Sequence, residues 1–520
     1  MIMKKFISFM LITVLMALGG CSKFLNVEPL DSLSGNNFWK TQEDVESFTR
    51  DIYRLFRDGL AVRSGLILMG DLRTGPVKST SAYPPRGDFN LLAKNDIKTL
   101  VSTPRIQGNV DTFWQLHGAW DDISDWQPIY KVIQASNILY DQVPGIIDSD
   151  PSFSPKMAKQ YQGEAVFMRC LSYFYLIRLF GDVPYYTKAS NQEALPRMDM
   201  NEVAKNCIAD LEAIREDLPW TYADPANRGV RAMQGSVLAL QMEFNMWLAA
   251  FDEANKTSYY NEVDRLGDIL TNEGEMQQGA YHLYPIEDIA QVFIGRSQEG
   301  LFEIPQNANY GDVLGNIRRT FTGAVLHEPY LRLNATNPYS EMAYYSAYMK
   351  ILYPEGQPDG RKDVWFDSNI YAENGAMQCF KFFNLALGEN NNVESLSNYF
   401  IIFRYAESIL LQAEALAELE NDEKAIQLLN RIRTRAKTAI FPAEPGEGDL
   451  KDAIFWERCK ELMGEGHYYY DMVRTRRVLD GEYSFNPMSY SDFMQGAWTW
   501  PINPKALTNN NNMTLNEFWR

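Results

Sequence analysis

Aromatic rings and polar side chains are interspersed in long stretches that lack helical periodicity, at about 65–125, 275–400 and 438–500. The C–H faces of a neutral sugar pack against aromatic rings, while its hydroxyl groups pair with amide, carboxylate and guanidinium groups. Long irregular segments on a rigid scaffold commonly carry such binding residues. The candidate ligand-binding residues in the first two stretches are Arg73, Tyr83, Arg86, Trp114, Trp120, Asn309, Tyr310, Arg318 and Arg319. The competing interpretation places the tryptophans in the core, where most such rings are found.

A pair of carboxylates could instead hydrolyse a glycoside, which requires two acids roughly 5 to 10 Å apart. Glu164 and Glu414 are the candidates, but both lie in predicted helices that also carry arginine, such as Arg169 and Arg404. Acids in that setting are more often structural ion pairs. The sequence contains no GxSxG, HExxH or GxxxxGK(S/T) motif, which would nominate a hydrolase, a zinc protease or a nucleotide site. We therefore predict no catalytic residue and no enzymatic activity.

Metal and cofactor sites have little support in the sequence. Asp121, Asp122 and Asp125 could offer oxygen atoms to Ca²⁺, but the glycine and terminal glutamate of an EF-hand do not accompany them. The chain has only four histidines, few for a histidine-rich site. We interpret the three aspartates as a solvated turn and predict neither a metal nor a cofactor.

The composition narrows the class of protein. The chain has 520 residues, of which 46% are hydrophobic and 22% charged, with a net charge of −18. These proportions are typical of a folded globular protein. Phosphate binding needs clustered lysine and arginine, so the acidic balance without a basic block argues against nucleic acid as a ligand.

The N-terminus predicts export and lipid anchoring. Lys4 and Lys5 precede an apolar run that ends at Leu18, as in a secretory signal peptide. That run is shorter than the roughly 20 residues needed to span a bilayer. The sequence Leu18-Gly19-Gly20-Cys21 resembles a lipobox, so residues 1–20 would be removed, Cys21 acylated, and residues 21–40 left as a tether. An ordinary cleavage site near Ala17 is the alternative.

Apolar spacing predicts the helices that must position the loops. Ala165, Met168, Ser172, Tyr175 and Leu179 recur at helical steps, and Gly181 followed by Pro184 predicts the end of that helix. Thr41 with Asp44 predicts a helix start. Helix pairs are expected at about 41–60, 128–180 and 199–251, with a hairpin at 403–436, and such pairs stack into a superhelical scaffold like that of tetratricopeptide repeats. The fold class is therefore mostly α with long irregular loops and a few short strands.

Two smaller predictions concern packing. Trp126 and Tyr130 share a helical face with Ile133 and Asn137, so they are expected to pack inside the protein. The four cysteines after Cys21 show no CxxC spacing and are expected to be buried free thiols: Cys170, Cys207, Cys379 and Cys459.

Several of these segments together resemble the SusD/RagB family of surface lipoproteins, nearly end to end. The resemblance is carried by Cys21 to Pro29 with Phe38-Trp39, Gln134-Ala-Ser-Asn137, Gly163 to Arg169, Leu179 to Pro184, Phe403 to Glu407 with Gln412 to Ala415, Leu429 to Arg433, Glu457-Arg458, Glu461-Leu462, Glu465-Gly466, Asp471 to Arg474, and Trp500-Pro-Ile502. The sequence departs from the family at Leu507–Asn512 and at Arg476, where the family generally has Gly.

The resemblance implies a SusD-like scaffold with an N-terminal part at 41–270 and a C-terminal part at 271–520. It also implies a non-catalytic protein that captures oligosaccharide outside the outer membrane and delivers it to a SusC-like TonB-dependent transporter. Peptide capture, as in the RagB branch, is one alternative. A surface glycoside hydrolase and a purely structural lid over the transporter are the others.

Overall fold

The computed structural model describes residues 38–61, 70–80, 87–102, 123–191, 193–274, 280–306, 340, 342–382, 385–387, 393–396, 398–443, 447–507 and 510–520. The predicted signal peptide and Cys21 lie outside these ranges. Over them the protein is mostly helical with a few short strands, as predicted.

The helices fall into two groups along the chain. The first group is α2 (Gln42–Phe56), α4 (Gly87–Ala93), α5 (Ile97–Ser102), α7 (Gln127–Ser149), α8 (Pro155–Phe180), α9 (Met200–Ile214), α10 (Gln234–Phe251), α11 (Lys256–Asp268) and α13 (Ala290–Ile294). The second is α17 (Ser346–Leu352), α18 (Gly360–Trp365), α19 (Tyr405–Glu418), α20 (Asp422–Arg435), α21 (Leu450–Glu461), α22 (Tyr468–Arg474), α23 (Tyr490–Met494) and α24 (Pro504–Leu507). Single π-helical turns follow α2 at Arg57–Ala61 and α11 at Ile269–Glu273. Short 3₁₀ turns lie at Arg215–Asp217, Pro225–Asn227, Glu253–Asn255, Ile286–Asp288, Arg477–Leu479 and Glu517–Trp519.

Local sequence signals account for the best-defined helix ends. Thr41 caps α2, and its hydroxyl and the Asp44 carboxylate accept each other's backbone N–H in a capping box. Ser154 caps α8, which ends at Gly181 with a φ of 72°, as predicted. Helices α7 and α8 pack together, as do α9 and α10, and α19 and α20. The pair expected at 41–60 is wrong, because α2 is a single helix that packs on α7.

Helix α21 lies in the stretch 438–500, which lacks helical periodicity and was predicted to be irregular. Its buried residues cover most of the helix and include charged Glu457, Arg458 and Glu461, while Asp452, Trp456 and Lys460 form a partly exposed stripe. Because three charged residues face the interior, the sequence of α21 does not separate apolar from charged positions as an amphipathic pattern requires.

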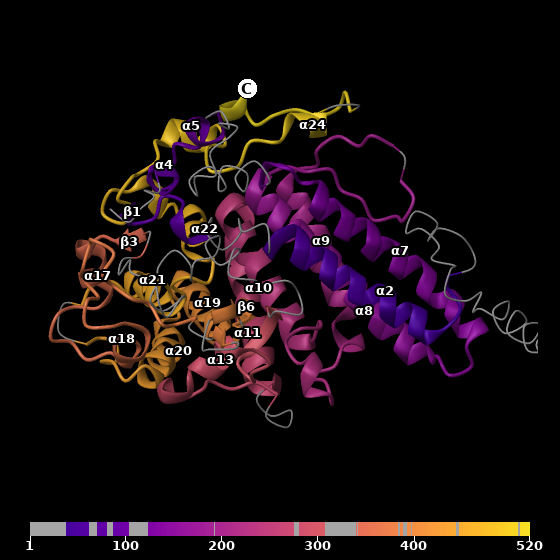
Figure 1. The fold of residues 1–520 in the computed structure, drawn as a ribbon, viewed down its shortest axis with the longest axis horizontal. Helices are drawn as coiled ribbons and strands as arrows, with labels where there is room; N and C mark the ends of the chain where they lie inside the picture. The colour runs from indigo at the N-terminus through magenta and orange to yellow at the C-terminus, as the bar shows by residue number, and fades with distance from the viewer. Residues whose placement is uncertain are drawn as a thin grey trace, which may run out of the picture.

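The strands form three two-stranded antiparallel sheets within the described residues. β1 (Val77–Ser79) pairs with β3 (Met342–Tyr344), β2 (Gly300–Ile304) with β6 (Phe400–Arg404), and β4 (Leu385–Leu387) with β5 (Val393–Leu396). All residues of β2 and β6 are buried, and β6 leads directly into α19. In Figure 1, α2, α7, α8 and α9 lie on the right and α17, α18, α20 and α21 on the left, with α10 and α11 between them.

An early part of the chain crosses to the C-terminal side of the molecule. α4, α5 and β1, drawn in indigo, lie at the upper left of Figure 1 beside yellow C-terminal segments. β1 also pairs with β3, a strand from the second half of the chain. Residues from both ends of the chain therefore build the same surface.

Two further expectations concern burial. The four cysteines after Cys21 are buried and free, as predicted. Trp126 and Tyr130 pack edge to face, and the Tyr130 hydroxyl donates to the carbonyl of Pro184 at 2.8 Å. Trp126 is buried and Tyr130 is partly buried against the core, so the prediction that they pack is confirmed. Among the described helices, none has the length and apolar character that a bilayer crossing requires.

Candidate functional site

The ladder between β1 and β3 brings together the chain ends from which two candidate binding segments extend. Ser79 pairs with Met342, and the Thr80 hydroxyl donates to the carbonyl of Ser340 at 2.5 Å. Residue 80 directly precedes segment 81–86, and residue 340 directly follows segment 307–339. One end of each segment is therefore attached to the described structure at this ladder. The candidates Tyr83, Arg86, Trp114, Trp120, Asn309, Tyr310, Arg318 and Arg319 lie outside the described residues.

Arg73 is the one candidate that the structure places, and it lies in the interior. Its side chain is fully buried, and its guanidinium donates to the carbonyls of Ala497 and Thr499 at 2.5 and 3.2 Å. The rings of Tyr469 and Trp500 flank it at 4.8 and 5.3 Å. Arg73 therefore ties the N-terminal segment to the C-terminal one and presents no donor to solvent.

Four residues around the ladder form an accessible surface that we call the β1 platform: Lys78, Tyr345, Glu373 and Phe485. The rings of Tyr345 and Phe485 are nearly parallel, with centroids 5.1 Å apart and planes at 8°. Phe485 is 39% exposed, high for a phenylalanine. The Lys78 ammonium lies 2.6 Å from the Glu373 carboxylate and 5.6 Å from the centre of the Tyr345 ring. Ring faces and both kinds of charge thus converge within one patch.

Local structure explains why these side chains meet. The Tyr345 N–H donates to the carbonyl of Pro76, which continues the pairing of the two strands by one residue. Glu373 accepts the Ser346 N–H at the start of α17 at 2.7 Å and so fixes its carboxylate beside Lys78. Sequence reasoning missed Tyr345 and Phe485. The run of tyrosines at 339, 344, 345 and 348 was the available signal.

Glu164 and Glu414, the two candidate carboxylates for glycoside hydrolysis, each form an ion pair with an arginine. Glu164 is fully buried and accepts two hydrogen bonds from Arg231, each of 2.8 Å, and one from the Tyr53 hydroxyl. Glu414 accepts from Arg474 at 2.7 Å. The prediction of ion pairs is confirmed, although the partner of Glu164 is Arg231 and not its helix neighbour Arg169. Neither acid is free to act as a general acid or base.

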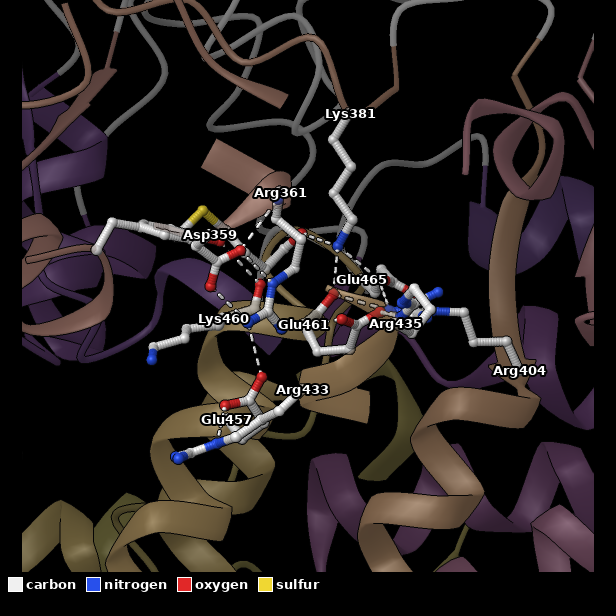
Figure 2. Close-up of polar contacts among 12 residues, drawn as sticks. Asp359, Arg361, Lys381, Arg404, Arg433, Arg435, Glu457, Lys460, Glu461 and Glu465 are labelled. Carbon is white, nitrogen blue, oxygen red and sulfur yellow. Dashed lines mark hydrogen bonds and ion pairs between the residues drawn. The ribbon is translucent and has the colours of Figure 1, made fainter. Parts of the chain in front are cut away.

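A larger buried network joins the helical hairpin to the C-terminal helices (Figure 2). Arg404, at the end of β6, reaches Glu299, Glu461 and Glu465 at 2.9, 2.7 and 2.6 Å. Lys381 pairs with Glu465 at 2.5 Å. All five side chains are almost fully buried, so each depends on its partners to offset the loss of hydration.

The same network extends to α18 and α20. Arg361 contacts Glu457 and Glu461 at 2.7 and 3.0 Å, and Arg433 contacts Glu457 at 3.0 Å. Burial alone would raise the pKa of Glu461, but the adjacent arginines hold it well below its ordinary value. These charges hold the scaffold together and have no access to a ligand.

A second buried cluster could hold a metal ion. Among the residues that the structure describes, Glu243, Glu407 and His467 place ligand atoms close together, with Nδ1 of His467 3.8 Å from Oε1 of Glu243. Burial and the neighbouring Glu243 charge raise the pKa of Glu407 well above its ordinary value, whereas burial lowers the pKa of His467 to about 4. The Arg178 guanidinium also lies 3.9 Å from the Glu243 carboxylate.

Comparison with known proteins agrees with this architecture. Residues 366–519 match the model of the SusD family, and residues 87–239 match a SusD-like model described as starch-binding and associating with the outer membrane. The fold and these matches define a SusD-like class of protein.

Similar proteins extend the match to nearly the whole chain. The crystal structure of a SusD homologue from Bacteroides thetaiotaomicron VPI-5482 is 38% identical with a TM-score of 0.80, covering 92% of this chain and 99% of that one. SusD-like protein P38 of Formosa agariphila is 25% identical, covering 95% of this chain and 97% of its own. A laminarin-binding SusD-like protein shares the fold, with a TM-score of 0.68 at 17% identity, covering 92% of this chain and 99% of that one. The chain belongs to the SusD family.

Proposed function

We propose that this protein is a non-catalytic glycan-binding lipoprotein of the cell surface that captures oligosaccharide and delivers it to a SusC-like TonB-dependent transporter. The observation that supports this most is the β1 platform. It offers a stacked tyrosine–phenylalanine pair with an ammonium and a carboxylate beside it. A sugar can pack on such rings and exchange hydroxyl hydrogen bonds with the charged groups.

The electrostatics of the platform favour a neutral ligand. Lys78 and Glu373 neutralise each other at 2.6 Å, so the platform has no net charge to attract an anionic polysaccharide. The chain as a whole carries −18, which adds a weak long-range repulsion of anions. Neutral oligosaccharides are therefore the ligand class that we expect.

We propose that the candidate segments 81–86 and 307–339 contribute to the site, because one end of each is attached beside the platform. Tyr83, Asn309, Tyr310 and Arg318 remain the proposed contributors. Trp114 and Trp120 also remain candidates, from the segment that follows α5. Arg73 is not part of the proposed site, because its guanidinium N–H groups donate to backbone carbonyls in the interior.

Localisation at the outer membrane is proposed to depend on acylation of Cys21. Each buried methylene of an acyl chain contributes about 0.8 kcal/mol to membrane binding, so several chains hold a protein firmly. Replacing Cys21 with Ser should move the protein from the membrane fraction to the soluble fraction of cells. A variant that stays membrane-bound would contradict the lipid anchor. Glycan binding is tested by a separate experiment.

The binding function is tested by calorimetric titration of the mature protein in detergent against neutral and anionic oligosaccharides and a peptide digest. Saturable binding of a neutral glycan, without release of reducing sugar, is the expected result. Binding of the digest alone would favour peptide capture, and release of reducing sugar would favour a hydrolase. The delivery step is tested by growth on that glycan, which should be lost when the gene is deleted.

A further inference from the structure

A cavity of about 710 Å³ opens between the ends of several helices. We call it the α23 pocket. Its walls come from the ends of α10 and α19, the start of α11, the turn after α22, α23 itself and the C-terminal segment. Ligand pockets commonly enclose about 300–1,000 Å³, so a short oligosaccharide fits by size. None of the four β1 platform residues lines this pocket, which makes it a separate place on the molecule.

Helix α23 presents an uncovered aromatic ring at the rim. Tyr490 is 68% exposed and Met494, one turn later, is 65% exposed, whereas Phe493 between them is 3% exposed. The Ser489 hydroxyl caps the helix by accepting the Asp492 N–H at 3.0 Å. Phe493 thus anchors the helix while Tyr490 faces outward, as a platform for the C–H face of a sugar requires.

The side chain of Arg476 forms part of the wall. Its guanidinium lies between the rings of Phe251 and Phe493 at 4.4 and 4.5 Å and donates to the carbonyl of Ala250 at 2.6 Å. The guanidinium therefore makes cation–π contacts with both rings and a hydrogen bond to the carbonyl. Because these contacts engage the guanidinium, Arg476 contributes to the shape of the pocket more than to the attraction of anions.

The other cations of the wall are also engaged. Arg474 is paired with Glu414 and Asp471, and Arg477 with Asp452. The exposed carboxylate of Glu517 has no ion pair within the described residues, and Glu253 faces only Lys256 at 3.9 Å. The exposed polar groups of the wall therefore include carboxylate acceptors and the Lys256 ammonium, both of which can pair with sugar hydroxyls.

We propose that the α23 pocket is a second carbohydrate site, which takes a neutral, hydroxyl-rich oligosaccharide with one ring stacked on Tyr490. The inference rests on the proposed glycan-binding function and adds a second point of contact. Two sites on one body retain a long glycan better than either alone, because the second contact forms at a high effective concentration.

The test uses calorimetry and ligand-observed saturation-transfer NMR on the mature protein in detergent, with maltoheptaose as the first probe and the neutral glycan that binds most strongly in the panel as the second. The wild type should bind two molecules of a short oligosaccharide. Tyr490→Ala should weaken one site about ten-fold and leave the other unchanged. The exposed control Tyr140→Ala, 39% exposed on α7, should change neither.

A platform variant separates the two sites. Phe485→Ala should retain NMR saturation transfer from the pocket, and adding Tyr490→Ala should remove it. A stoichiometry of one that Tyr490→Ala does not affect would overturn the second site and leave the proposed function standing. Failure of the wild type to bind any neutral glycan would overturn the proposed function itself.

Discussion

Tyr345 and Phe485 stack with their ring centroids 5.1 Å apart and their planes at 8°. Tyr345 directly follows β3, and Phe485 lies in the turn before α23, so the stack exists only because the fold brings these two segments together. Lys78 of β1 adds a charge beside it. Three segments distant in sequence therefore build one patch beside the ladder of β1 and β3.

The buried ion network should be a major source of stability. In Glu461→Gln, Arg404, Arg435 and Arg361 lose the carboxylate that they share. Breaking a buried ion pair by removing one partner costs about 3–5 kcal/mol, because the remaining charge stays buried and unpaired. We expect the free energy of unfolding, measured by urea denaturation, to fall by about that amount.

Glu287→Gln is the matched control for this change. Glu287 pairs with Lys437, but both side chains are more than half exposed, and exposed pairs contribute little. It should unfold like the wild type. Equal stability of Glu461→Gln and the wild type would contradict the role given to the network.

Stability should also depend on pH through Glu303. This carboxyl group is almost fully buried on β2, and burial raises its pKa to about 8 despite the hydrogen bond from the Arg296 N–H. Between the unfolded value near 4.5 and about 8, the folded state holds a proton that the unfolded state has released. The free energy of unfolding should therefore fall as pH rises through this window, by up to about 1.4 kcal/mol per pH unit.

Glu303→Gln isolates this contribution, because an amide resembles the neutral acid and does not ionise. Its stability relative to the wild type should rise between pH 5 and about 8 and then stay constant. Urea denaturation at several pH values measures this difference. A difference that does not change with pH would mean that Glu303 is ionised in the folded protein.

Arg476 occupies a left-handed backbone position, with a φ of 62°. Arg476→Gly and Arg476→Ala both remove the guanidinium, so their difference reports only on the backbone. Non-glycine residues are disfavoured there by about 1–2 kcal/mol, part of which the greater unfolded-state freedom of glycine offsets. The Gly variant should be more stable than the Ala variant by about 1 kcal/mol.

The neighbouring residue tests the sign of that effect. Arg477 begins a 3₁₀ turn and does not have a positive φ. At Arg477 the order should reverse, with Ala more stable than Gly. Chemical denaturation of all four variants provides the comparison, and the same order at both positions would rule out the backbone explanation.

The sequence predicted those parts of the fold that depend on local pattern. The apolar stripe of α8, its end at Gly181 and the hairpin of α19 and α20 all follow from residue spacing. Helix α21 was missed because its charges are buried with partners from other elements. Arg231 as the partner of Glu164 was missed for the same reason, since Glu164 lies on α8 and Arg231 lies in the segment before α10.

The candidate site was less predictable. Arginine is a residue type that often contacts ligands, so Arg73 was a reasonable candidate. Its guanidinium instead donates to backbone carbonyls near the C-terminus, far from Arg73 in the sequence. Phe485 lies in a turn whose sequence matches no binding motif. The patch is recognisable only from the packing of Phe485 against Tyr345. In both cases the information lies in contacts between distant segments, which periodicity does not report.

The most direct test of the account is the affinity of Phe485→Ala for the neutral glycan that the wild type binds, measured by calorimetry beside Tyr140→Ala. Phe485 and Tyr140 are each 39% exposed, so the two variants remove similar amounts of aromatic surface from different places. The β1 platform predicts about ten-fold weaker binding at one site for Phe485→Ala and unchanged binding for Tyr140→Ala. Wild-type affinity in Phe485→Ala would contradict the platform as the place of glycan capture.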